Sequence, residues 1–144
     1  MCIRDSAAGA TRGLLVYLID AYHEENVKDA KGNDTMRVVM KLHPKLAPFK
    51  VAILPLIKKD GLPEIARSLV KDFMKSGINA RYDEQHAIGK RYRRHDEVGT
   101  PYCITIDGET KDDNCVTIRD RDTMLQERIP IADAIEIVKN KLNQ

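Results

Sequence analysis

Four cations fall within five consecutive residues near the middle of the chain: Lys90, Arg91, Arg93 and Arg94. The surrounding pattern predicts a helix over residues 88–98. On that helix Lys90 and Arg91 both lie one turn before Arg94, so the three share a face. Like charges at this spacing repel by about 0.2–0.5 kcal/mol per pair, a cost that a bound polyanion removes. The run therefore indicates an anion-binding surface, with an ordinary solvated basic face as the alternative.

Two carboxylates, Asp96 and Glu97, follow the cations directly. At the C-terminal end of a helix the macrodipole disfavours a negative charge by about 0.3–1 kcal/mol. Such local conflicts occur more often at functional sites than elsewhere. A carboxylate beside cations can accept a hydrogen bond from a nucleobase amino group, of which cytosine N4 is an example. The alternative is an exposed ion pair with Arg93 or Arg94, which contributes little.

Two further arginines, Arg119 and Arg121, follow a predicted strand. Alternate residues of an extended chain point the same way, so we expect both side chains to face outward. Planar guanidinium groups stack on bases and fork to phosphates. The alternative is a charged turn whose signs cancel. Tyr92 and Tyr102 are candidate stacking partners, with half-buried packing as their alternative.

Composition and spacing argue against other chemistry. The net charge is only +2, so any basic footprint is local, and 42% hydrophobic with 32% charged residues is typical of a globular domain. The four histidines and three cysteines show no metal-ligand or disulfide pattern, and no phosphate-binding glycine motif occurs. No apolar run is long enough to span a membrane, so we expect a cytoplasmic protein without a membrane partner.

Alternating strands and helices are predicted to position these residues. The expected strands cover residues 50–56, 78–83, 102–107, 115–119 and 124–129, and the expected helices cover residues 63–76, 88–98 and 130–142. This order predicts an α/β fold whose sheet begins parallel and ends antiparallel, flanked by helices, over residues 49–144. Residues 108–114 are expected to form a polar loop.

The N-terminal third has a different pattern. Apolar residues at helical spacing predict a helix over residues 7–25. The polar residues 26–34 are predicted to form a surface loop, and residues 27–48 a linker. The first six residues, Met1–Ser6, back-translate to a sequence similar to a sequencing-library adapter. We therefore interpret them as non-native, with an ordinary but unusual start as the alternative.

Three runs carry a family resemblance: residues 46–56, 88–107 and 116–124. They resemble glycyl-tRNA synthetases of the dimeric class II bacterial type. The resemblance implies the anticodon-binding domain of class IIa synthetases, a mixed five-stranded sheet flanked by three helices over residues 49–144. It also implies that residues 7–26 are a helix remnant of the class II catalytic domain.

That remnant resembles the end of class II motif 3, whose arginine contacts ATP. By position Arg12 is this arginine, Gly9, Ala10 and Thr11 line the ATP pocket, and Gly9 also belongs to the glycine pocket. The Glu-Pro-Ser expected just upstream is replaced by Asp5-Ser6-Ala7, and motifs 1 and 2 do not occur. The resemblance implies a homodimeric parent that activates glycine with ATP and Mg²⁺. The fragment alone is expected to bind no cofactor and to be inactive.

The resemblance also suggests which partner the charged residues bind. Glycine anticodons carry two cytosines, and a cytosine reader combines carboxylates with arginines. We therefore predict that the anticodon stem–loop of glycine tRNA, rather than DNA, contacts eight residues: Lys90, Arg91, Arg93, Arg94, Asp96, Glu97, Arg119 and Arg121.

Three alternatives stay open. In the first, the chain is a stand-alone anticodon-domain paralogue that serves as an accessory or regulatory tRNA-binding subunit. In the second, it is a small-molecule α/β enzyme with its pocket at the strand ends. The third is a structural role, in which the sheet packs on a catalytic domain or a dimer mate. That role is compatible with anticodon binding.

Overall fold

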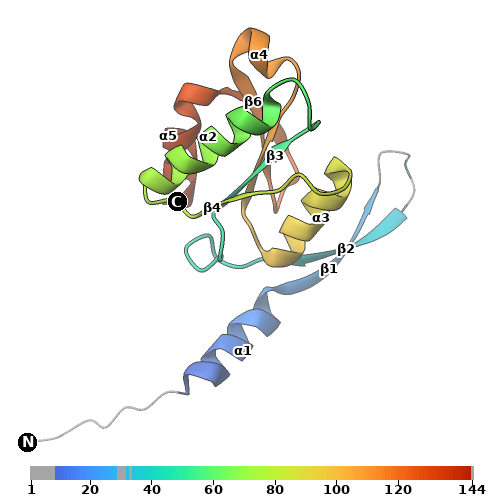
Figure 1. Ribbon diagram of the computed structural model, residues 1–144. Helices are drawn as coiled ribbons and strands as arrows, with labels where there is room; N and C mark the ends of the chain where they lie inside the picture. Colours follow the sequence, from blue (N-terminus) through green and yellow to red (C-terminus); the bar gives the residue numbers. More distant parts are fainter. Residues whose placement is uncertain (1–8, 29–31, 33, 144) are drawn as a thin grey trace, which may run out of the picture.

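A mixed five-stranded sheet forms the centre of the molecule (Figure 1). The computed structural model describes residues 9–28, 32 and 34–143, so the interpretation of Met1–Ser6 lies outside the described residues. The strands are β3 (Val51–Pro55), β4 (Ala80–Tyr82), β5 (Tyr102–Ile106), β6 (Cys115–Asp120) and β7 (Gln126–Pro130). Their spatial order is β4-β3-β5-β6-β7. Strand β3 pairs in parallel with β4 and β5, whereas β5–β6 and β6–β7 are antiparallel, as the sequence predicted.

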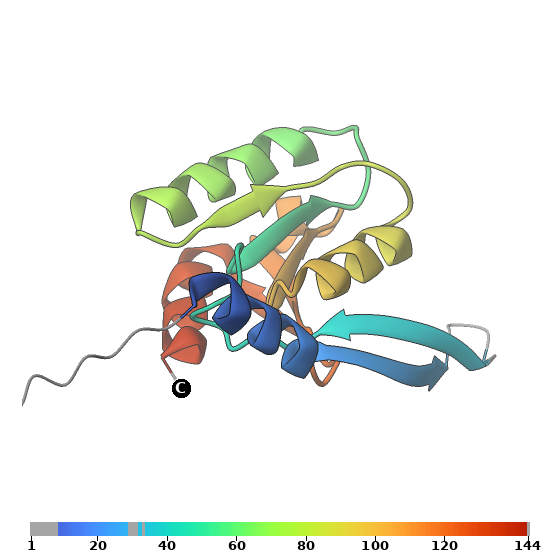
Figure 2. The ribbon, with the colours of Figure 1, turned by 90° about the horizontal axis from the view of Figure 1, so that it is seen from below.

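Three helices cover the two faces of this sheet. Helices α2 (Leu62–Lys75) and α5 (Ala134–Leu142) lie on one face, and α3 (Ile88–Val98) lies on the other (Figures 1 and 2). The short elements α4 (Thr110–Asp113) and η1 (Ile131–Asp133) complete the connections, so the predicted loop over residues 108–114 contains one helical turn. The predicted α/β class with a five-stranded mixed sheet is confirmed.

Strand β3 shows why the sheet forms here. All five of its residues are buried, because each face is covered by helices. Its side chains alternate: Val51 and Ile53 join the large core under α2 and α5, and Ala52 and Leu54 lie under α3. Helix α3 therefore covers the face of the sheet that carries Ala52, Leu54 and Cys103.

A two-stranded antiparallel hairpin precedes the sheet, where we expected the end of a helix and a linker. Its strands are β1 (Tyr22–Lys28) and β2 (Asp34–Met40), and β2 packs against α3 (Figure 2). The prediction was wrong because the strands carry no clear apolar alternation: Arg37 takes a position that is only 2% exposed. The close approach also explains Gly99, whose φ of 84° ends α3 and where a Cβ would lie 3.0 Å from the Met40 carbonyl oxygen.

Helix α1 (Ala10–Ala21) extends away from the sheet (Figure 1). It is shorter than the predicted helix over residues 7–25, because the chain turns into β1 at Tyr22. Its apolar residues Leu14 to Ile19 are all between 38% and 67% exposed. No helix in the described ranges has the length and apolar content needed to cross a membrane.

Candidate nucleic-acid interface

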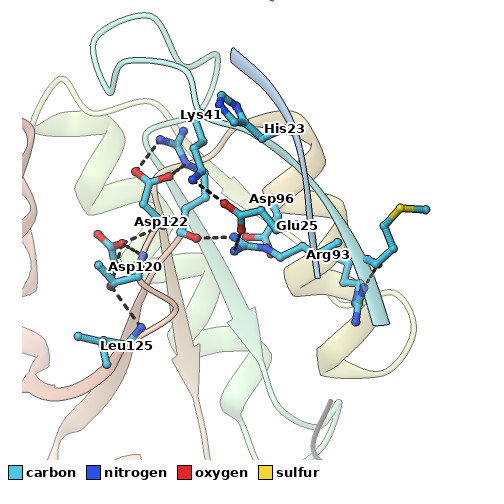
Figure 3. Close-up of polar contacts among 12 residues, drawn as sticks. His23, Glu25, Lys41, Arg93, Asp96, Asp120, Asp122 and Leu125 are labelled. Atoms are coloured by element: carbon cyan, nitrogen blue, oxygen red, sulfur yellow. Dashed lines mark hydrogen bonds and ion pairs between the residues drawn. The ribbon is translucent and has the colours of Figure 1, made fainter. Parts of the chain in front are cut away.

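One of the two predicted carboxylates, Asp96, lies at the centre of a buried charge network (Figure 3). Its two oxygens accept hydrogen bonds from Arg119 Nη1 at 2.9 Å, Arg119 Nη2 at 3.2 Å and Arg37 Nε at 3.0 Å. Arg37 comes from the hairpin and Arg119 from β6, while Asp96 belongs to α3. The unfavourable position of Asp96 at the helix C-terminus is therefore offset by two arginines rather than left for solvent.

Arg119 and Arg121 do not face outward, so that prediction was wrong. Their exposed fractions are 7% and 3%. Arg119 pairs in register with Cys103, on the face of the sheet that α3 covers. Arg121 donates to the Leu42 and Gly99 carbonyl oxygens at 3.0 and 2.9 Å, and forks to the neighbouring Asp122. Both arginines thus join α3 and the hairpin to the end of β6.

The four cations of α3 also separate, because the helix packs against a different neighbour on each side. Arg91 is buried, donating to the Pro55 carbonyl oxygen at 2.6 Å, so the expectation that it shares an open face was wrong. Arg94 pairs with Asp83 at 2.6 Å. Arg93 donates to the hairpin, to the Met36 carbonyl oxygen and to Thr35 Oγ1, each at 2.8 Å.

Lys90 and Glu97 are the two predicted contact residues that are plainly exposed. Arg93 and Arg94 are partly exposed, and the remaining four are buried. The eight residues therefore divide into a framework that holds α3, β6 and the hairpin together, and a smaller set on the surface above it.

A pocket of about 150 Å³ lies where these elements meet. The hairpin, α3, β6 and the turn after β6 line it with nine residues: Val27, Lys28, Arg37, Gly89, Tyr92, Arg93, Asp96, Arg119 and Met124. Three of the predicted residues are thus brought together in one cavity. The sequence reading missed Val27, Lys28 and Arg37 because it treated the hairpin as a linker. It also did not single out Gly89 and Met124, which carry no charge.

Tyr92 and Arg119 form one wall of this pocket. The Arg119 guanidinium carbon lies 4.7 Å from the centre of the Tyr92 ring, and the Tyr92 hydroxyl is 2.6 Å from Thr105 Oγ1. Burial raises the pKa of Tyr92. Burial lowers the pKa of Arg119, but the hydrogen bonds and charge of Asp96 raise it more. The wall therefore presents a neutral phenol and a permanent cation at neutral pH.

Tyr102 does not belong to the pocket. It is 7% exposed, packs in the large core, and donates from its hydroxyl to the Lys141 carbonyl oxygen at 3.4 Å. Packing, the alternative to stacking, is the reading that the structure supports for this side chain.

Gly9, Ala10, Thr11 and Arg12 lie exposed at the start of α1, at the end that points away from the sheet (Figure 1). The structure brings none of them to the pocket. Arg12 supplies a single guanidinium group there. Within the part of the chain that the structure describes, no group of three or more His, Cys, Asp and Glu side chains is placed to hold a metal ion.

Aromatic rings and guanidinium groups such as those in this pocket are the groups on which unstacked RNA bases stack in known complexes. Comparison with known families agrees: the sequence pattern of the family described as "Anticodon binding domain" matches residues 50–141, and the chain belongs to this family.

Its relatives are glycine–tRNA ligases. The chain is 48% identical to that of Treponema denticola over 140 residues, 47% identical to that of Rhodopirellula baltica over 138, and 49% identical to that of Clostridium perfringens over 140. The aligned parts cover 96–97% of this chain but only 31%, 26% and 29% of these relatives. The chain thus spans under a third of the length of the proteins it matches.

Proposed function

We propose that this chain is the anticodon-binding part of a glycine–tRNA ligase and that it binds the anticodon region of glycine tRNA. The observation that carries the proposal is the family match over the sheet and its helices, together with the 47–49% identity to glycine–tRNA ligases. The proposed parent is a cytoplasmic homodimer that attaches glycine to tRNA through glycyl-adenylate.

The geometry supports this proposal along one face of α3. Lys90 and Arg93 are cations at the surface there, and Glu97 is an exposed carboxylate, the group that a cytosine amino donor needs. Beneath them the buried network of Asp96 and Arg119 fixes α3 against β6. We propose that Arg91, Arg94 and Arg121 act mainly by holding this surface in place, and that the exposed residues make the first contacts with RNA.

ATP and Mg²⁺ belong to the proposed parent rather than to this chain. In that parent Arg12 would contact the ATP phosphates, and Gly9 to Thr11 would lie beside the nucleotide and glycine. The described residues supply one guanidinium group for this chemistry, so we propose that the chain alone does not activate glycine. The exposed apolar face of α1 supports a parent in which α1 is covered, and it disfavours a stand-alone accessory subunit.

The test is binding of the whole chain to glycine tRNA and to a variant with both anticodon cytosines replaced, over a series of salt concentrations. We expect a loss of about 1–3 kcal/mol per replaced base, in addition to a salt-dependent phosphate contribution. Glu97→Gln should reduce the preference for the cytosines, whereas Glu64→Gln, an exposed change on α2, should not. Equal binding to both tRNAs, or binding to neither by a folded chain, contradicts the proposal.

A further inference from the structure

The segment between α1 and the sheet is a paired hairpin rather than a free connection. Helix α1 ends at Ala21, and β3 begins at Val51. A flexible segment of that length would let its ends separate over a broad range of about 30 Å. Here the segment instead forms strands β1 and β2, which pair over seven residues each. A connection of this kind can fix the position of α1 instead of only limiting its distance from the sheet.

Ala21 forms the joint between α1 and the hairpin. The N–H of Tyr22, the first residue of β1, donates to the carbonyl oxygens of Leu18 and Ile19, so the strand starts directly on the last turn of the helix (Figure 1). The Ala21 carbonyl oxygen also accepts from the Lys41 N–H at 2.7 Å, and Ala21 is only 4% exposed. The end of α1 is therefore bound both to the start of β1 and to the residue that follows β2.

Two arginines bind the hairpin to α3 (Figure 3). Arg37 of β2 donates to Asp96 at 3.0 Å, to Glu25 of β1 at 3.1 Å and to the Arg121 carbonyl oxygen. Arg93 of α3 donates to two groups of β2, each at 2.8 Å. Asp96 and Arg93 lie about one helical turn apart on α3. Because the hairpin is held at two points of the helix, it cannot pivot about a single bond.

The chain just after β2 is also packed tightly against the end of α3. A Cβ on Gly99 would lie 3.0 Å from the Met40 carbonyl oxygen and 3.0 Å from Leu42 Cδ1. Arg121, which is 3% exposed, donates to the carbonyl oxygens of Leu42 and Gly99. Moving the hairpin away would leave buried guanidinium groups without partners, which is strongly unfavourable. The contacts of the hairpin thus resist both rotation and separation.

We propose that hairpin β1–β2 is a rigid strut that fixes the direction of α1 relative to α3, and that Arg37 and Arg93 are its positioning residues. The inference rests on the proposed function and deepens it, because in the proposed parent the strut sets the separation between the ATP site beside Arg12 and the anticodon surface of α3. A tRNA that contacts two sites at once binds better when their separation is fixed in advance than when a flexible linker must be ordered.

The test measures the distance between spin labels on α1 and α2 by pulsed electron paramagnetic resonance. The labels are attached after Val16→Cys, at a position that is 64% exposed, and Lys71→Cys, on the exposed side of α2. Cys2→Ser and Cys115→Ser remove two other thiols, and Cys103 stays because it is only 2% exposed. With the hairpin unchanged, the label distances should form one narrow distribution.

Releasing the hairpin should widen that distribution. Arg37→Met should broaden it at least about twofold, toward the spread of a flexible linker. Arg93→Met should broaden it as well, and since Arg93 is only partly buried this variant should fold even if Arg37→Met does not. Arg128→Met is the matched control, because Arg128 binds the carboxylates of Asp107 and Asp113 but makes no ion pair with the hairpin. It should leave the distribution unchanged.

A second label pair separates release of the hairpin from unfolding. Labels attached after Lys71→Cys and Lys139→Cys join α2 to α5, and their distance distribution should stay narrow in every variant. A broad α1–α2 distribution with the hairpin unchanged, or a narrow one in both Arg37→Met and Arg93→Met, overturns the strut and leaves the proposed function standing. Equal binding of glycine tRNA and its cytosine-replaced variant contradicts the proposed function alone, because the label distances are measured without RNA.

Discussion

Helix α1 and hairpin β1–β2 are joined without a break at Tyr22, yet they relate to the sheet in opposite ways. The helix is apolar and exposed, with Val16 64% and Ile19 67% accessible. The hairpin is rich in charge, and its Arg37 is only 2% exposed. Attachment in this molecule therefore follows specific polar partners on α3 and β6 rather than the hydrophobicity of the segment. The apolar helix instead keeps most of its apolar side chains exposed.

The largest effect that tests this contrast should come from Asp96→Ala. The change leaves Arg37 and Arg119 buried without their carboxylate, and breaking such a buried pair costs about 3–5 kcal/mol. Urea unfolding measures the loss. Asp122→Ala is the matched control, since Asp122 is 48% exposed in its pair with Arg121 and should contribute below about 1 kcal/mol. Equal losses in the two variants would show that the hairpin is not held by the buried network.

The sheet could be predicted from the sequence and the hairpin could not, for a physical reason. Strand β3 is a continuous apolar run because helices cover both of its faces, and this pattern is legible without a structure. Strand β2 buries Arg37 beside Val39, so its buried face shows no apolar alternation. Only the position of Asp96, on another helix, makes that burial favourable.

The sequence identified the residue types of the candidate site but not how they are arranged in space. Asp96 was chosen because a carboxylate at a helix C-terminus conflicts with a local rule, and Arg119 because a guanidinium group after a strand can stack on bases or fork to phosphates. The direction of the Arg119 side chain depends on the pairing of Arg119 with Cys103, which places its guanidinium group under α3. Spacing along one strand cannot show which face a neighbouring helix covers.

A smaller effect should appear when the hairpin is acidified. The hydrogen bond from Lys41 lowers the pKa of Glu25; burial opposes this, and the charges of Lys41 and Arg37 add to it. A depressed folded-state pKa gives stability that is present above the unfolded value of about 4.3 and is lost as the pH falls through the folded value. Because the pair is partly exposed, we expect a contribution below about 1 kcal/mol.

Hydrogen exchange of the hairpin amides over this pH range measures the effect as protection factors. Other carboxylates titrate in the same range, so the comparison is between the unchanged chain and Glu25→Gln. As the pH falls below about 4.3, Glu25→Gln should lose less hairpin protection than the unchanged chain does. Identical acid profiles in the two proteins would mean that Glu25 does not help to hold the hairpin.

The smallest effect should come from Leu15→Ala on α1. Leu15 is 56% exposed, so its truncation should change the free energy of unfolding by no more than about 0.5 kcal/mol. Leu54→Ala, at a fully buried position under α3, should cost about 2–5 kcal/mol in the same assay. A loss above about 1 kcal/mol for Leu15→Ala would show that α1 is packed in solution, by the sheet or by a second copy of the chain. Analytical ultracentrifugation of both variants separates these cases, because only packing between copies makes the loss depend on protein concentration.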